Sequence, residues 1–490
     1  MGTPDLVADV VVIGGGSGGC VVASRLGEDA GRSVLLVESG PGYSSVEDCP
    51  VRDYRVMQVG PSSPWAARYS ADLMPGLPTH TLRGRVLGGS GAVNGAYFVR
   101  AREEDFARWP ASWSYADVLP YFVRTEHDHD FTGPDHGTTG PVPVRRRSAS
   151  TLADISSAFV AAAAEVGHPT EEDKNGGEPS GVGPVPLNVS DETRMSSAIA
   201  YLLPALHRSN VKVLCETSAT RVIFSGGKVS GVELVRDGSR ITVRTTCVVA
   251  AAGAIETPML LMRSGIGDSR ELAQHGITVV SDLSGVGRSA ADHPEVLIPV
   301  RAVEQLRRSD DCPALEVCLN MEDIEIRPYT AGFDQLVPGS GEANRYVGVG
   351  LMKSRSRGSI RMVSADPDVA PQIEYRYLES EADRRHLRQG ISEARHILES
   401  ASMRRIAETP EVEDTDGWML RHLATSQHLS STCRMGDDAD RDAVVDERCR
   451  VKGVEGLYIA DSSAMPRVPS RGPHATTLMI GERVADFIRM

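Results

Sequence analysis

A glycine-rich turn near the start of the chain has the residue types and spacing of a dinucleotide-binding site. Residues 14–19 read GGGSGG and directly follow the apolar run at 10–13. Glycines there permit a tight turn and a close approach of the backbone to a pyrophosphate, and the next helix would offer free N–H groups. Glu38 ends the following apolar run, where a carboxylate can accept hydrogen bonds from a ribose diol. We therefore assign to cofactor binding Gly14, Gly16, Ser17, Gly18, Gly19 and Glu38.

A second cluster could imitate a metal site. Residues 127–130 read HDHD, and imidazoles and carboxylates are common metal ligands. Along an extended chain, however, alternation places the two imidazoles and the two carboxylates on opposite sides. We predict no metal site.

Composition excludes several classes of protein. The 490 residues carry 52 Lys and Arg against 66 Asp and Glu, a net charge of −14, which excludes a basic nucleic-acid binder. With 41% apolar and 24% charged residues the chain is globular, and its length suggests two to four domains. Eight cysteines without a CxxC pair indicate free thiols. No apolar run is long enough to span a membrane, so we expect a cytoplasmic protein and leave a peripheral membrane contact open.

The elements that must position the glycine-rich turn form a βαβ unit. A strand at 10–13, a helix from 17 and a strand at 33–37 are expected from the apolar runs. Two later apolar runs, 246–254 and 456–461, resemble strands that return to the same sheet. Since ligands bind at the carboxyl ends of such strands, Gly253 and Asp461 should lie near the cofactor. The fold class is α/β, with a discontinuous, doubly wound, Rossmann-like sheet.

The middle of the chain has a different pattern. Runs at 346–353 and 359–363 predict a hairpin, the runs at 296–300 and 324–327 predict further strands, and 381–400 has helical spacing. These features predict an α+β substrate domain with an antiparallel sheet. We place the cofactor domain at 1–150, 190–288 and 425–490, and the substrate or cap domain at 151–189 and 289–424.

Several ordered segments together resemble one family. They are GRVLGGSGAVNGAYF at 84–98, GAIETPMLLMRSGIG at 253–267, HLSSTCRMG at 428–436, DSSAMP at 461–466 and HATT at 474–477. The chain resembles the glucose-methanol-choline oxidoreductases, FAD-dependent enzymes that oxidise alcohols. The resemblance implies a flavin dehydrogenase or oxidase that acts on CH–OH groups.

The resemblance also implies roles for single residues. His428 matches the general base and His474 its partner, although the two roles could be exchanged. Histidine suits both roles because its pKa lies near neutrality. The remaining cofactor contacts that the resemblance implies are Ser90, Asn94, Gly95, Tyr97, Val222, Asp461 and Ala475. Some members tether FAD through a histidine where this chain has Val93, so we expect non-covalent FAD.

A narrower likeness points to a substrate. Segments 89–95, 325–330 and 470–476 are similar to the mycofactocin-associated branch of actinobacteria, which implies that the chain reoxidises mycofactocinol and passes electrons to the respiratory chain. An alcohol oxidase that uses oxygen and a non-catalytic FAD-binding or assembly protein stay open as alternatives. A nicotinamide-dependent reductase would not explain the family segments. No motif indicates the oligomeric state or the electron acceptor.

Overall fold

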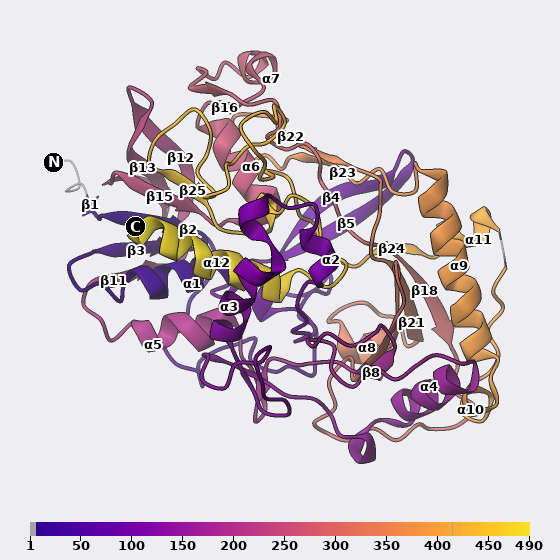
Figure 1. Ribbon diagram of the computed structural model, residues 1–490. Coiled ribbons are helices and arrows are strands. Elements are labelled where there is room, and N and C mark those ends of the chain that lie inside the picture. The colour runs from indigo at the N-terminus through magenta and orange to yellow at the C-terminus, as the bar shows by residue number, and fades with distance from the viewer. Residues whose placement is uncertain (1–5, 414) are drawn as a thin grey trace.

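The computed structural model describes residues 6–413 and 415–490, and the predicted domain boundaries include residues outside these ranges (Figure 1). The cofactor-binding part is built on a five-stranded parallel sheet in the order β11-β3-β2-β15-β25. Its strands are Val211–Leu214, Val34–Val37, Val10–Ile13, Cys247–Ala250 and Leu457–Ile459. The predicted return of two distant segments to the first βαβ unit is confirmed, as is the α/β fold class.

Two helices from opposite ends of the chain pack together beside this sheet. Helix α1 covers Ser17–Leu26 and α12 covers His474–Arg489, and the two lie side by side in Figure 1. Gly481 of α12 faces Val21 and Gly18 of α1, so the small residue lets the helices approach closely. Arg25 of α1 holds the fully buried Glu482 of α12 with a 2.9 Å ion pair.

A four-stranded sheet, in the order β1-β14-β13-β12, flanks the parallel sheet. Its strands cover Leu6–Val7, Ser239–Arg244, Lys228–Arg236 and Ser218–Ser225. Helix α6, Gly253–Arg263, packs on β12. Helix α6, which begins just after the carboxyl end of β15, thus links the parallel sheet to the four-stranded sheet.

The middle of the chain forms a six-stranded antiparallel sheet, as the sequence predicts. Its order is β24-β18-β21-β20-β19-β8, with strands Leu423–Thr425, Pro294–Val300, Arg345–Leu351, Ile324–Pro328, Val317–Asn320 and Val182–Pro184. The predicted helix is α9, Glu381–Leu398, and its Gly390 lies against Ile324 of the sheet. Since strand side chains alternate, Glu325 and Arg327 project from the face opposite α9.

The predicted hairpin at 346–363 is wrong. Strand β21 stays in the six-stranded sheet, whereas β22, Ser359–Arg361, joins a second sheet of order β22-β23-β4-β5. The linker does not turn back because Asp383 of α9 accepts hydrogen bonds from the N–H groups of Arg355 and Ser356, at 3.0 and 2.9 Å. Gly358 then pairs with Ala290, which directs the chain into the second sheet.

Short elements complete the described chain. The other strands of the second sheet are β23 Gln372–Glu374, β4 Ala66–Met74 and β5 Leu77–Gly84. The short strand pairs are β6 Glu126–Asp128 with β7 Val142–Val144, β9 Val189–Ser190 with β10 Thr193–Arg194, and β16 Ile266–Gly267 with β17 Ser281–Asp282. The remaining α-helices are α2 Glu103–Phe106, α3 Tyr115–Thr125, α4 Asp154–Glu165, α5 Leu203–Ala205, α7 Ser269–Gln274, α8 Phe333–Leu336, α10 Ala401–Arg404 and α11 Asp416–Arg421.

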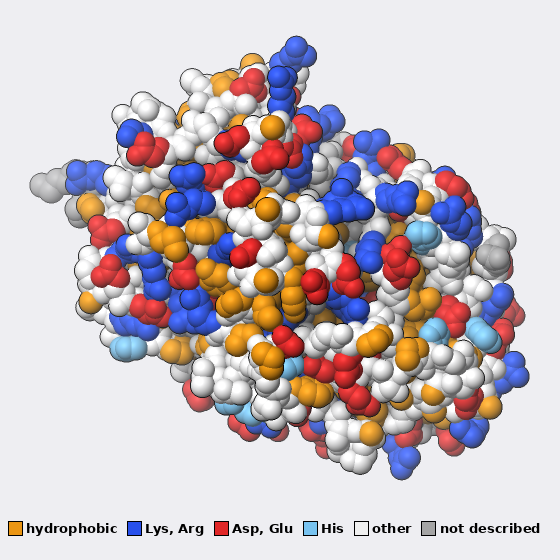
Figure 2. Space-filling view, in the orientation of Figure 1, with side chains coloured by type: hydrophobic (Ala, Val, Ile, Leu, Met, Phe, Trp, Pro, Cys, Tyr) orange, Lys and Arg blue, Asp and Glu red, His pale blue; other side chains and the backbone are white. Residues whose placement is uncertain are grey.

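Surface and thiol chemistry agree with the composition. On the face shown in Figure 2, acidic and basic side chains are interspersed. All eight cysteines are free, as expected from their spacing. Over residues 6–413 and 415–490, no helix is both long and apolar enough to cross a membrane.

Candidate active site

The glycine-rich turn connects β2 to α1 with a backbone that only glycine adopts easily. Gly14 has φ +101°, and a Cβ there would lie 2.9 Å from the Cα of Ala252. Helix α1 begins directly after Gly16, and no side chain caps it. Its first N–H groups are therefore available to an anion, as the sequence predicts for a pyrophosphate.

Glu38 lies at the end of β3 and is buried beside this turn. Its Oε2 accepts a hydrogen bond from the Gly15 N–H at 2.8 Å, and its Oε1 accepts one from the Gly40 N–H at 2.7 Å. Burial raises the pKa of Glu38, while these two N–H groups oppose the shift. Oε1 also accepts the Ser39 hydroxyl, whereas Oε2 keeps a lone pair that can accept a bond from a diol.

His474 opens helix α12 and lies against the glycine-rich turn. Its Nδ1 is 3.2 Å from the Oγ of Ser17, and no side chain caps α12. The Nε2 of His474 is buried and has no hydrogen-bond partner. Burial, reinforced by Arg194, lowers the pKa of His474 to about 4, so the ring is neutral at pH 7. Ala475, the next residue, is fully buried.

His428 lies against a second histidine, His293. Their Nδ1 atoms are 2.9 Å apart and the rings meet edge to face at 84°. Burial lowers the pKa of His428 well below its usual value, and the nearby His293, Arg327 and Arg83 act in the same direction. His293 is fully buried, and burial together with Arg327 lowers its pKa to about 3. Both rings are therefore neutral at pH 7.

The backbone around His428 is strained and fixed from several sides. Gln427 has φ +64° and Ser431 has φ +68°, a region that side chains rarely occupy. The Oε1 of Gln427 accepts hydrogen bonds from the Leu82 N–H at 3.2 Å and from the Thr81 hydroxyl at 2.9 Å. Such over-determined strain is typical of functional sites, and here it sets the direction of the His428 side chain.

The first family segment lies against His474 at Gly91 and reaches the six-stranded sheet at Tyr97. Asn94 Oδ1 accepts a hydrogen bond from the Ala96 N–H at 2.9 Å, and a Cβ at Gly95 would lie 3.6 Å from the sulfur of Met57. The Tyr97 hydroxyl donates to Glu325 at 3.2 Å. Ser90 is exposed, and its Oγ accepts a bond from the Gly84 N–H. Their flavin contacts stay predictions.

Two further predicted residues have structural partners. Asp461 Oδ2 accepts bonds from the Gly253 N–H at 2.8 Å and from the Thr257 hydroxyl at 2.6 Å, so the ends of β25 and β15 meet as expected. The N–H of Val222 donates to Ser264 Oγ at 2.8 Å. An adenine contact at Val222 would therefore have to use other atoms of that residue.

The sequence does not identify the charged groups that face the histidines. Arg327 forms a 2.7 Å ion pair with Glu295, and it donates a 2.9 Å hydrogen bond to Ser426, whose N–H in turn donates to the His293 carbonyl. All three side chains belong to the six-stranded sheet or the residue that follows it. The alternation of charged and apolar residues at 324–327 is the signal that could have indicated this wall.

Of the HDHD segment, Asp128 belongs to a buried charged group, and Asp130 lies at its edge, 3.5 Å from Arg146. Glu126, Asp128 and His136 lie close enough together to share a cation. Hydrogen bonds to carboxylates outweigh burial and raise the pKa of His136 to about 11, so the imidazolium itself is the cation. His136 donates to Asp173 at 2.7 Å, and Arg146 holds Asp128 at 2.9 Å. This arrangement is a structural ion cluster.

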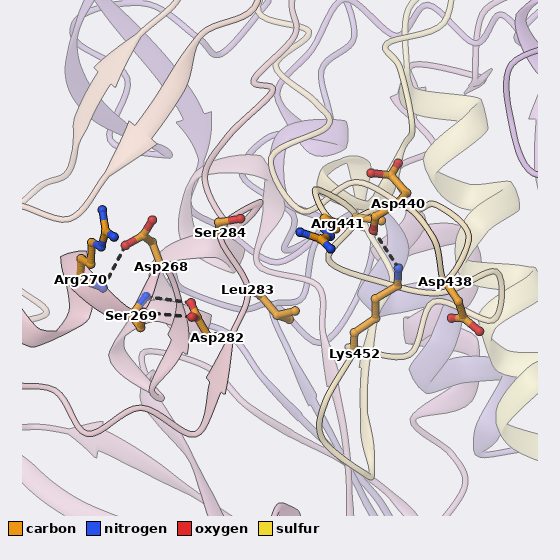
Figure 3. A pocket seen from close by; sticks show the side chains of 11 residues that line it. Asp268, Ser269, Arg270, Asp282, Leu283, Ser284, Asp438, Asp440, Arg441 and Lys452 are labelled. Carbon is orange, nitrogen blue, oxygen red and sulfur yellow. Dashed lines mark hydrogen bonds between the residues drawn. The ribbon is translucent and has the colours of Figure 1, made fainter.

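A surface hollow of about 440 Å³ lies elsewhere (Figure 3). Its polar groups already bind one another, as Asp282 does with Ser269 at 2.9 Å. None of its lining residues is among the candidate site residues. We assign it no chemistry.

Comparison with known proteins identifies the family. The N-terminal and C-terminal family models described as GMC oxidoreductase match residues 8–295 and 354–481. An uncharacterized GMC-type oxidoreductase of Rhodococcus erythropolis is 47% identical over 98% of both chains. An oxygen-dependent choline dehydrogenase of Brucella anthropi is 33% identical over 98% of this chain and 95% of its own.

Solved structures agree with this assignment. Pyridoxine 4-oxidase from Mesorbium loti superposes with a TM-score of 0.90 at 28% identity, covering 98% of each chain. A formate oxidase shares the fold, with a TM-score of 0.88 at 24% identity over 100% of this chain and 99% of its own. The chain therefore belongs to the GMC oxidoreductase family, whose members are FAD-dependent oxidoreductases acting on CH–OH donors.

Proposed function

We propose that the chain binds FAD non-covalently and oxidises a polar, hydroxyl-bearing substrate, with His428 as the proton acceptor. The substrate that the sequence favours is mycofactocinol, with electrons passing onward to the respiratory chain. The observation that carries the proposal is the neutral His428 ring, held beside a wall of buried charged side chains.

The residues present fit FAD. The uncapped start of α1 suits a pyrophosphate, and Glu38 keeps acceptor capacity for a ribose diol. The buried Nε2 of His474 lacks a partner in the protein, and such an orphan polar atom is expected where a bound group supplies the bond. Val93 is fully buried and offers no nucleophile at the position of the covalent tether, which supports non-covalent binding.

When bound, FAD supplies the acceptor for hydride from the hydroxyl-bearing carbon. The protein has to remove the hydroxyl proton and hold the oxygen that becomes negative. His428 is neutral at pH 7 and can accept that proton. His474 is also neutral, and its Nε2 can hold the oxygen by donating a hydrogen bond if Nδ1 accepts from Ser17. The two roles could be exchanged.

The wall opposite α9 supports a polar substrate. Arg327 and Glu295 are buried, and the hydroxyls of Tyr97 and Ser426 belong to the same hydrogen-bonded group. Nε of Arg327 and Oε1 of Glu325 are buried without a hydrogen-bond partner in the described chain, and a small apolar alcohol would leave them so, at a cost of about 1–3 kcal/mol for each. A carrier with several hydroxyl or carbonyl groups would satisfy them.

Oxygen as the electron acceptor is the second candidate. The Brucella relative is described as oxygen-dependent, and the superposed pyridoxine enzyme is an oxidase. In that case simple alcohols or aromatic alcohols would be the substrates. The residues that we propose for proton transfer would be the same.

The test is the anaerobic visible spectrum of the purified holoenzyme. We expect reduced mycofactocin to bleach the flavin, simple alcohols to leave it oxidised, and air to restore the colour slowly. Bleaching by simple alcohols with rapid recovery in air would contradict the carrier assignment and indicate an oxidase. If no donor bleached the flavin, the chain would be a non-catalytic FAD-binding protein.

The variant His428→Asn separates binding from chemistry. It should keep FAD and slow bleaching by about 100-fold or more, since loss of a general base costs about that factor. The matched control His422→Asn changes a histidine whose Nδ1 donates to the Trp418 carbonyl at 2.8 Å. Equal rates in wild type and His428→Asn would remove His428 from the mechanism.

A further inference from the structure

We propose that His293 is a positioning residue that fixes the tautomer of His428, so that the Nε2 lone pair of His428 faces the reacting hydroxyl. The inference rests on the proposed function, because it concerns the same proton acceptor. It goes beyond that function by assigning a task to a further buried histidine.

One carboxylate ties the two histidines together. The Oδ1 of Asp292 accepts the backbone N–H of His293 and that of His428, each at 2.7 Å. Its Oδ2 accepts the hydroxyl of Thr425 at 2.8 Å. Asp292 is buried, so both backbones are held at fixed positions relative to each other. The 2.9 Å contact between the rings is therefore built into the fold.

The contact between the two Nδ1 atoms is a hydrogen bond that contains a single hydrogen. A neutral imidazole carries one N–H, on either nitrogen. Two lone pairs at 2.9 Å would repel, and two hydrogens would clash, so one Nδ1 donates and the other accepts. A positively charged pair is disfavoured by Arg327, which lowers the pKa of both rings.

The contact between the rings leaves one nitrogen of His428 for the substrate. Its Nδ1 is engaged with Nδ1 of His293, so a proton from the substrate can be accepted only on Nε2. A neutral proton acceptor needs a bare Nε2, and its single hydrogen then lies on Nδ1. His428 therefore donates its Nδ1–H to a bare Nδ1 of His293, whose own hydrogen lies on Nε2.

The bare nitrogen of His428 lies beside Gly472. A Cβ at Gly472 would lie 3.6 Å from Nε2 of His428, and glycine leaves that space free. In the opposite tautomer His428 would present an N–H to the substrate and could accept no proton at Nε2. The balanced step is transfer of the hydroxyl proton to Nε2 of His428, while its Nδ1–H stays bonded to His293.

The experiment reads the tautomer directly. In holoenzyme labelled with ¹⁵N-histidine, the NMR signals of His428 are assigned by their loss in His428→Asn. We expect a protonated Nδ1 and a bare Nε2 on His428. In His293→Phe, which removes the acceptor, this preference should disappear, and flavin reduction should slow by about 10- to 100-fold. His422, whose Nδ1–H is fixed by a carbonyl, is the internal control.

A second variant distinguishes the loss of the hydrogen-bond acceptor from misfolding. His293→Asn can place an amide oxygen near the position of Nδ1, and it should restore the protonated Nδ1 of His428 and most of the reduction rate. A hydrogen on Nε2 of His428 in the wild type would overturn the inference. So would an unchanged His428 tautomer in a folded, slow His293→Phe enzyme. The variant His428→Asn tests the proposed function separately, because a wild-type rate of flavin reduction in that variant would remove His428 as the proton acceptor whatever the tautomer.

Discussion

Nδ1 of His474 lies 3.2 Å from Oγ of Ser17, although 457 positions separate the two residues. Ser17 begins the first helix of the cofactor sheet, and His474 begins the last helix of the chain. The start of α1, which suits a pyrophosphate, therefore also contacts a side chain that we propose to be catalytic. A substitution at the start of α1 should therefore shift the side chain at the start of α12, and the reverse.

Gly91 should be needed for the placement of His474. A Cβ at this position would overlap Cε1 of His474 and lie 2.6 Å from Oγ of Ser17. We expect Gly91→Ala to displace the histidine and lower kcat by about 10- to 100-fold. The control is Gly177→Ala, where a Cβ meets nothing within 4 Å. Stopped-flow flavin reduction compares the two, and equal rates would contradict the placement.

Gly472 should determine how much space is available beside His428, the proposed proton acceptor. A Cβ would make an ordinary contact with His428 at 3.6 Å, so Gly472→Ala should fold. It would occupy space that a substrate hydroxyl needs, and KM should rise by about tenfold, which is about 1.4 kcal/mol. Melting temperature and FAD content should not change. A KM equal to that of Gly177→Ala would show that substrate approaches from elsewhere.

Glu38 should stabilise both the fold and the cofactor. Glu38→Ala leaves the buried N–H groups of Gly15 and Gly40 without their acceptor, which costs about 1–3 kcal/mol for each. Urea unfolding of the FAD-free protein measures this loss, and FAD titration should show weaker binding. Replacing the exposed Glu322 by Ala controls for loss of charge. Unchanged FAD affinity in Glu38→Ala would exclude a ribose contact.

Stability should fall in mild acid because buried histidines stay neutral. The pKa of His293 is lowered to about 3, whereas an unfolded histidine titrates near 6.5. Between these values the unfolded chain binds a proton that the folded chain excludes, so stability is full above about pH 6.5 and declines as pH falls toward 3. Urea unfolding at about pH 5 and pH 7.5 should show a smaller difference for His293→Asn than for wild type. An equal difference would assign the acid sensitivity to other groups.

The sequence predicts the cofactor sheet well because its signals are local. The apolar run at 10–13, the glycines after it and Glu38 lie within one βαβ unit, and their geometry follows from adjacent residues. The sequence also predicts the strands at 247–250 and 457–459, because each is an apolar run that is followed directly by small or acidic residues. Their contact through Asp461 follows from the parallel topology.

The sequence does not predict contacts made by partners far along the chain. The hairpin at 346–363 fails because Asp383, on a later helix, holds the linker that should have turned. His293 pairs with His428 across 135 positions, and no local pattern links the two residues. Arg327 on β20 and Glu295 on β18 meet across the glycines of β21, the strand between them, and no local pattern specifies the register of that sheet.

The two proposed catalytic histidines belong to different scaffolds. His428 follows β24 of the six-stranded sheet, whereas His474 is carried by α12 beside the parallel sheet. The distance between the two rings therefore depends on how the six-stranded sheet is oriented relative to the parallel sheet. A ligand, solvent or pressure that changed this alignment slightly would alter turnover without touching either imidazole. The turnover rate would then depend on the relative placement of the two sheets as well as on the residues of the site.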